Sequence, residues 1–140
     1  MSNKPRELAK LPKSELTIMQ LIWEMRRLGE PVENITAGNL MQRYPDKIGH
    51  LKLTTVLTLI SRLINKNFIR AEKIGRSYCY IPLVDEEEYK SFAAKDFVST
   101  VFKNDARSLI SALVTTKNLT EKDIEDLMKM FESKKADKKE

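Results

Sequence analysis

The stretch from Lys52 to Leu83, KLTTVLTLISRLINKNFIRAEKIGRSYCYIPL, decides the fold of this chain. Its first part predicts a helix over about 53–66, because apolar residues recur there at helical spacing: Val56, Leu59, Ile60 and Leu63. Its second part predicts two strands, 68–74 and 77–83, because both runs are rich in β-branched and aromatic residues and are separated by a turn at Gly75. A helix followed at once by a two-stranded basic ribbon is the arrangement of a winged-helix nucleic-acid-binding domain.

The side of this helix opposite its apolar face is rich in hydroxyl groups. A helix that enters the DNA major groove meets base edges with small or adaptable polar groups near its N-terminus. A threonine can donate or accept a hydrogen bond, and its methyl group can contact a thymine methyl. The residues that we expect to contact DNA are Lys52, Thr54, Thr55, Thr58 and Arg62 in the helix, and Lys73 and Arg76 in the hairpin.

Several of these residues also have a simpler interpretation, which the sequence leaves open. Thr54 or Thr55 could cap the helix, and Thr58 could merely be solvated. Arg62 could form a structural ion pair instead of a phosphate contact, and Arg76 could be ordinary exposed charge. As a group, followed directly by a basic hairpin, they favour nucleic-acid binding.

The positive charge of the chain is concentrated around this helix and hairpin. Residues 1–84 hold 14 Lys and Arg against 7 Asp and Glu, whereas residues 85–140 hold 11 against 13. Such an excess suits binding to a phosphate backbone, which releases condensed counterions. No apolar run of about 18 residues exists that could cross a membrane, and the polar start lacks the apolar core of a signal peptide. We expect a cytoplasmic protein without a membrane partner.

The chain has one cysteine, Cys79, and one histidine, His50. A single cysteine excludes a disulfide within the chain and a cysteine-based metal cluster. A lone histidine cannot by itself build a nucleophile–base pair or a usual metal site. The sequence also lacks a Gly-rich phosphate loop, so we predict neither an enzyme nor a cofactor or metal.

Further helices are expected on the N-terminal side of the central stretch. Residues 1–12 should form a flexible arm, and Ser14 should cap a helix that begins at Glu15. A short helix, capped by Thr36, should follow over 37–44, and the segment 45–49 should turn the chain.

The composition changes at Asp85, where an acidic run resembles the capped start of a helix. We expect three helices with broad apolar faces from there, the last one beginning with a capping box of Thr120 and Asp123. A unit this small rarely builds a sufficient core alone, so a second copy of the chain should cover these faces. The alternative is that they pack back onto the N-terminal half. The residues expected in the dimer contact are Tyr89, Phe92, Phe97, Val101, Leu109, Leu113, Ile124, Leu127 and Phe131.

The predicted fold is therefore mainly α with a small β-wing. Residues 1–12 are the flexible N-terminal arm, 13–84 a winged helix-turn-helix DNA-binding domain, 85–133 a C-terminal three-helix dimerisation domain, and 134–140 a disordered charged tail. The function that competes with DNA binding is a winged-helix protein-interaction module without direct DNA readout.

Three motifs of the chain resemble the BlaI/MecI/CopY family of bacterial repressors, also called penicillinase repressors. The run ELTIMQLIW at 15–23 is similar to the opening helix of that family, with its terminal Trp. The run TTVLTLISRL at 54–63 is similar to its recognition helix, and GRSYCYIPL at 75–83 to its wing. The resemblance covers about residues 11–132.

The resemblance implies a homodimeric transcriptional repressor on a pseudo-palindromic DNA operator. It assigns DNA contacts to Thr54, Thr55, Thr58, Arg62 and Arg76.

The chain departs from members of the family at several places. Some members have Arg where this chain has Leu57, so that base contact is lost or replaced. In β-lactam-responsive members a sensor pathway cleaves an Asn–Phe bond, and the aligned pair here is Ala112-Leu113. A sensor protease is one candidate partner that would release the repressor from DNA. A small ligand and another protease are the alternatives. The tail has no cysteine, which argues against the copper sensing of other members.

Overall fold

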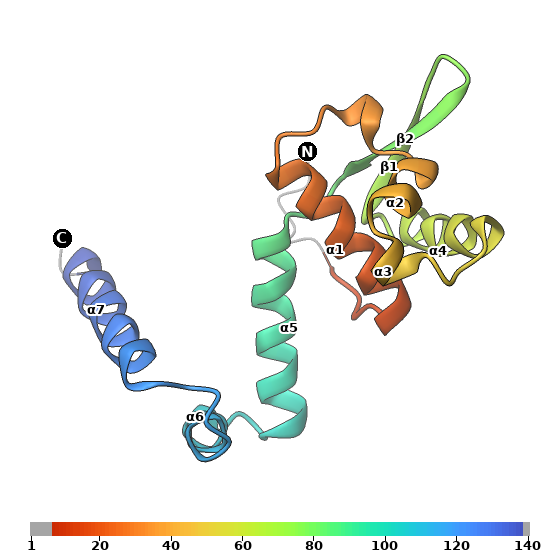
Figure 1. The fold of residues 1–140 in the computed structure, drawn as a ribbon. Coiled ribbons are helices and arrows are strands. Elements are labelled where there is room, and N and C mark those ends of the chain that lie inside the picture. The colour runs from red at the N-terminus through yellow and green to blue at the C-terminus, as the bar shows by residue number, and fades with distance from the viewer. Residues whose placement is uncertain (1–6, 139–140) are drawn as a thin grey trace. The chain divides into compact units, whose positions relative to one another are not determined.

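The computed structural model describes residues 7–138, which form seven α-helices, one 3-10 helix and a two-stranded antiparallel sheet (Figure 1). This mainly helical fold with a small β-wing is the fold class predicted from the sequence. The chain divides into two compact units, one that ends at Ala93 and one that begins at Ala94. The elements in chain order are α1 (Lys13–Arg27), η1 (Val32–Asn34), α2 (Ala37–Arg43), α3 (Pro45–Ile48), α4 (Leu53–Asn65), β1 (Ile69–Ile74), β2 (Ser77–Pro82), α5 (Glu86–Val101), α6 (Ala106–Thr115) and α7 (Glu121–Lys138).

Helix α1 begins earlier than the sequence suggested. The prediction that Ser14 caps it is wrong, because Pro12 occupies the N-cap position and its carbonyl accepts a hydrogen bond from the Leu16 N–H at 2.9 Å. The helix ends as the sequence predicts, since Gly29 and Pro31 follow its last turn and both residues disfavour a helix. Gly29 adopts φ +83°, a left-handed conformation that glycine takes at little cost, and the N–H groups of Gly29 and Glu30 close a Schellman motif on the last turn.

The predicted second helix is confirmed as α2, and Thr36 caps it by accepting a hydrogen bond from the Asn39 N–H at 3.1 Å. The segment 45–49, predicted as a turn, instead forms the one-turn helix α3. Pro45 stands at its first position, where its missing N–H is not needed and its fixed φ already suits a helix.

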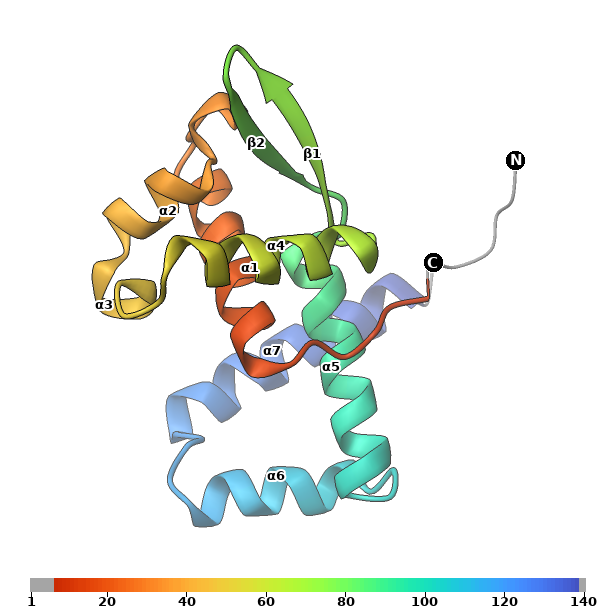
Figure 2. The ribbon, with the colours of Figure 1, turned by 90° about the vertical axis from the view of Figure 1, so that its right-hand side faces the viewer.

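Helix α4 buries one face and exposes the other, as predicted. Its buried residues are Val56, Leu59, Ile60 and Leu63, each no more than 5% exposed. These side chains pack into the core of the first unit together with apolar residues of α1, across which α4 lies (Figure 2). Burial of this face fixes which residues α4 presents to the outside.

Strands β1 and β2 form the predicted hairpin, with Lys73 opposite Tyr78 and Ile74 opposite Ser77. Gly75, at φ +64°, makes the tip, and the tip projects beyond the helices of its unit (Figures 1 and 2). The N–H of Tyr80 donates to the carbonyl of Ile35 at 3.0 Å, which ties β2 to the segment after η1. The hairpin is thus anchored at its base and free at its tip.

Tyr89 of α5 closes the core of the first unit. Its ring centroid lies 5.9 Å from that of Trp23 and 5.7 Å from that of Phe68. Its hydroxyl accepts a hydrogen bond from the Leu11 N–H at 2.9 Å, and Leu11 is buried. Leu11, with the half-buried Leu8, therefore holds this segment against the core, which corrects the predicted flexible arm for this part. Residues 1–6 of that arm lie outside the described residues.

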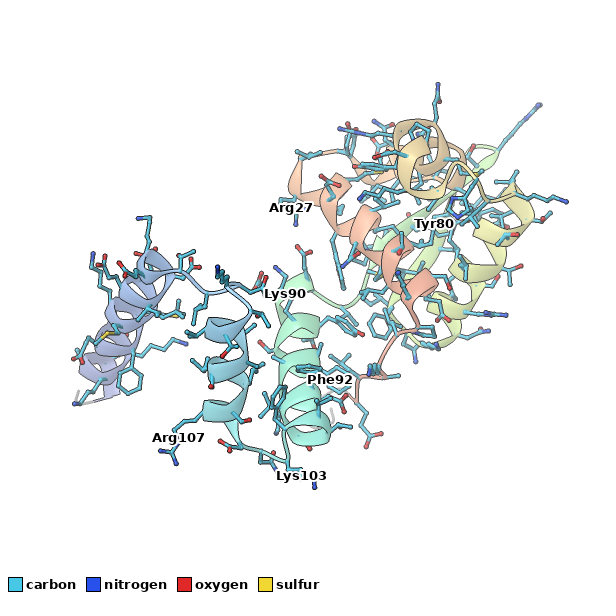
Figure 3. All side chains as sticks on the ribbon, turned by 60° about the horizontal axis from the view of Figure 1, so that its bottom comes forward. Arg27, Tyr80, Lys90, Phe92, Lys103 and Arg107 are labelled. Carbon is cyan, nitrogen blue, oxygen red and sulfur yellow. The ribbon has the colours of Figure 1, made fainter. Side chains whose placement is uncertain are left out.

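The second unit contains the end of α5, then α6 and α7. Lys103, at the turn before α6, and Arg107, in its first turn, are labelled in Figure 3. The predicted capping box of α7 is confirmed, because Thr120 and Asp123 exchange hydrogen bonds of 3.0 and 3.1 Å. The prediction of a disordered tail is wrong for 134–138, where α7 continues, since Lys and Ala favour helix and no Gly or Pro interrupts them. Residues 139–140 lie outside the described part.

An ion pair between a buried carboxylate and a partly exposed lysine joins α1 to the end of α4. The Glu15 carboxylate is 3% exposed, and Lys66 Nζ lies 2.6 Å from its Oε1. We expect Lys66→Met to lower the free energy of unfolding by about 2 kcal/mol, because it leaves a buried carboxylate without a partner. The change is measured by urea denaturation.

The double variant Glu15→Met/Lys66→Met serves as the control for this prediction. Apolar residues of similar size often replace a buried pair at little cost, so it should recover most of the lost stability. A double variant less stable than Lys66→Met would contradict the view that the unpaired Glu15 carboxylate causes the loss of stability.

Candidate nucleic-acid interface

The exposed face of α4 carries the residues that the sequence singled out. Residues three and four positions apart are neighbours on a helix surface, so Thr54, Thr58 and Ser61 form one exposed strip opposite the buried side. Thr55 and Arg62, both exposed, lie along one flank of that strip. The structure thus brings the predicted residues of α4 together on one surface.

The structure excludes the helix-cap interpretation of Thr54 and Thr55. Lys52 occupies the N-cap of α4, and no side chain caps the helix there. Neither Thr54 nor Thr55 is therefore a cap, and both side chains are available to a ligand. The Thr58 hydroxyl donates to the Thr54 carbonyl at 2.9 Å, so its oxygen and methyl group are what it can offer to a partner.

Arg62 does not form the structural ion pair that was its alternative. No carboxylate pairs with it in the part of the chain that the structure describes, and the side chain is exposed. Its position at the far end of α4 suits a contact with a phosphate.

The hairpin carries its cations near its outer end. Lys73 Nζ lies 5.8 Å from the ring centroid of Tyr78, which is 53% exposed. Arg76 is exposed beside Gly75 at the tip. Arg70 lies 3.3 Å from Glu72, so its charge is partly offset within the hairpin. Lys73 and Arg76 are therefore the hairpin cations best placed to meet an anion.

A cationic cavity that the sequence did not reveal lies beside the segment leading into α4. It measures about 510 Å³ and is lined by Lys13, Ser14, Thr17, Lys47, Ile48, His50 and Leu51. Lys47 and His50 are close in sequence, so part of this lining could have been noticed. Lys13 joins it only through the packing of α1, which spacing along the chain cannot indicate. Such a lining suits phosphate oxygens.

The residues predicted for a dimer contact fall into two groups. Tyr89 lies in the core of the first unit. Phe92, labelled on α5 in Figure 3, packs half-buried against that core, and its ring centroid lies 5.9 Å from that of Tyr89. Both side chains stabilise the first unit. The periodicity of the sequence could not distinguish this role from a role in dimerisation. The other seven lie in the second unit. Leu109 and Leu113 are half-buried, and Phe97, Val101, Ile124, Leu127 and Phe131 are exposed.

An apolar cavity of about 360 Å³ lies within the second unit. Its lining comes from α6, α7 and the loop between them: Ile110, Leu119, Ile124, Leu127, Met128, Phe131 and Glu132. Phe131 is 67% exposed and Met128 63%, so the apolar side chains of α7 are largely open in the single chain. The pair Ala112-Leu113 is half-buried within α6.

Other kinds of site are not found among residues 7–138. These residues contain no cluster of three or more His, Cys, Asp or Glu side chains that could hold a metal ion. Within the same range, no helix has the length and apolar character needed to span a membrane.

A helix with one buried and one hydroxyl-bearing face, beside a hairpin with cations near its tip, defines the class of winged-helix regulators. The family model of the penicillinase repressor matches residues 11–133, and the chain belongs to this family of transcriptional repressors. The family resemblance noted from the three motifs is thereby confirmed.

Relatives match over nearly the whole chain. The methicillin resistance regulatory protein MecI of Mammaliicoccus sciuri is 31% identical over 134 residues, which cover 96% of this chain and 100% of the relative. The penicillinase repressor of Bacillus licheniformis is 23% identical over 96% of this chain and 99% of its own length. The penicillinase repressor of Staphylococcus aureus is 27% identical over 91% of this chain and 92% of its own length.

Proposed function

We propose that this repressor binds DNA directly and sequence-specifically, as a homodimer on a pseudo-palindromic operator. The observation that carries the proposal is the exposed face of α4, where threonine hydroxyl and methyl groups lie beside Arg62, which pairs with no carboxylate among residues 7–138. Occupation of the operator would exclude the transcription machinery from the same DNA.

The elements of the first unit divide the work of DNA binding. Helix α4 enters the major groove, and Thr54, Thr55 and Thr58 meet base edges. The N–H groups at the start of α4, which no side chain caps, can donate to a phosphate, with Lys52 beside them. Arg76 at the hairpin tip reaches a phosphate or the minor groove of the flanking DNA.

Association of two copies through the second unit supports this mode of binding. Its helices expose apolar side chains in the single chain, and α6 has no buried residue. Contact between two second units would cover these side chains and present two α4 helices to successive half-sites. Such half-sites lie one helical turn, about 34 Å, or a multiple of it apart.

The first prediction concerns the dependence of binding on salt. We expect log K for operator DNA to fall linearly with log salt, with a slope of roughly 0.9 per neutralised phosphate. Arg76→Ala should lower this slope by about 1.8 for a dimer with two equivalent wings, and should weaken operator and random DNA alike. Fluorescence anisotropy over a range of salt concentrations measures both effects.

Lys95→Ala is the matched control, because Lys95 is an exposed lysine of α5 outside the proposed surface. Binding that does not change with salt would refute the electrostatic contact with DNA. A protein that binds no promoter or selected duplex at all would leave the protein-interaction module as the better description.

The second prediction concerns base reading by Thr58. Thr58→Ala should weaken operator binding by about 1 kcal/mol per half-site, or roughly fivefold, and leave binding to random DNA unchanged. Thr116→Ala is the matched control, because the Thr116 hydroxyl also donates to the carbonyl four residues earlier, at 2.8 Å. An equal loss of affinity on operator and random DNA for Thr58→Ala would exclude base reading.

The third prediction concerns the dimer contact. Leu127→Glu and Phe131→Glu place a charge on the apolar lining of the α7 cavity, and we expect each variant to sediment as a monomer with weak half-site binding. Met130→Glu is the matched control, because Met130 is 54% exposed on α7 but does not line that cavity. If both variants still sediment as dimers, the two copies associate through another surface.

A further inference from the structure

Two leucines interrupt the polar surface of α4. Leu57 is 39% exposed and Leu53 is 51% exposed, although α4 has an apolar face buried in the core. Leu57 has Leu53 and Ser61 four positions away and Thr54 three positions away, so it borders the strip of hydroxyl-bearing residues. The exposed leucines therefore belong to the surface that faces the major groove in the proposed function.

The chemistry of the major groove leaves one kind of partner for such a side chain. Leucine neither donates nor accepts a hydrogen bond, and most groups on the base edges do one or the other. The apolar group on these edges is the C5 methyl of thymine. A leucine placed against a polar base edge would cover that edge without replacing its hydrogen bonds to water. A thymine methyl is thus the contact that favours Leu57 at this position.

We propose that Leu57 reads a thymine methyl in each half-site and is a specificity-determining residue of this repressor. The inference rests on the proposed function, because it requires α4 to lie in the major groove. Leu53, one turn earlier, extends the apolar patch toward the start of the helix. The contribution comes from burial of apolar surface, so it adds discrimination between bases without adding charge.

The expected size of the effect follows from the area of one methyl group. Burying one such group changes affinity by about fourfold at one half-site and by about fifteenfold when both half-sites are altered. These changes are smaller than those for a good bidentate hydrogen-bond pair, and they are readily measured by competition binding.

The test uses the full chain and a duplex that it selects from a random DNA pool. Each thymine of the selected half-site is replaced in turn by deoxyuridine, which removes the methyl and keeps the base pairing. We expect one position at which this replacement weakens binding of the unaltered protein about fourfold. At that position Leu57→Ala should bind the thymine and deoxyuridine duplexes equally, whereas Leu57→Met, which keeps an apolar side chain of similar size, should retain most of the difference.

Controls separate this effect from a general loss of structure. Leu28→Ala changes a leucine that is 59% exposed at the end of α1, and it should keep the full thymine preference. Leu57→Ala should unfold at the same temperature as the unaltered protein, since Leu57 lies outside the core.

Two results would overturn the inference while leaving the proposed function intact. One is a selected half-site in which no thymine methyl affects affinity. The other is an equal effect of deoxyuridine on the unaltered protein and on Leu57→Ala. Failure to select any duplex is a different outcome, because it removes the proposed function and this inference with it.

Discussion

The structure of the first unit depends on a set of contacts between buried aromatic side chains around Trp23. Its Nε1 donates to the Val84 carbonyl at 2.8 Å, and its ring packs against Tyr89, which in turn contacts Phe68 and the Leu11 N–H. These residues come from α1, both ends of the hairpin, the start of α5 and the segment before α1. Because the contacts hold the base of the hairpin against α1, they fix the side on which the wing stands relative to α4. The arrangement of the DNA-binding surface follows from this packing.

The sequence predicted the elements whose patterns are local. Helix α4 and the hairpin were recognisable because the apolar spacing and the glycine turn that predict them both lie within residues 52–83. The sequence could not tell which core an apolar stripe faces, so Tyr89 was grouped with the dimer contact although it completes the first unit. The helix α3 was missed because four residues carry too little periodicity. The basic cavity was missed because Lys13 approaches Lys47 only in the folded chain.

The second unit shows why a short helical segment calls for a partner. Its α6 and α7 are well capped, by Asp105 and by the pair of Thr120 and Asp123, so each helix is locally specified. A hydrogen bond from the Thr120 backbone N–H, and a second one from the Thr120 side chain, stabilise the charged form of Asp123 and lower the pKa of that carboxyl. Capping fixes where a helix begins, yet it covers no apolar surface. The exposed side chains of α7 are therefore consistent with the proposed dimer, in which a second copy of the same unit would cover them with closed symmetry.

In the proposed function, the two faces of α4 separate fold from specificity. Substitutions on the outward face leave Val56, Leu59, Ile60 and Leu63 in place, so related chains can change what they read without losing the core. An arginine at the position of Leu57 would bind through charge, and part of its effect would fade as salt screens it. A leucine against a thymine methyl releases no counterions, so its contribution persists when phosphate contacts weaken. For this repressor, raising the salt concentration should therefore weaken binding to all DNA. The preference for its own operator over random DNA should change less.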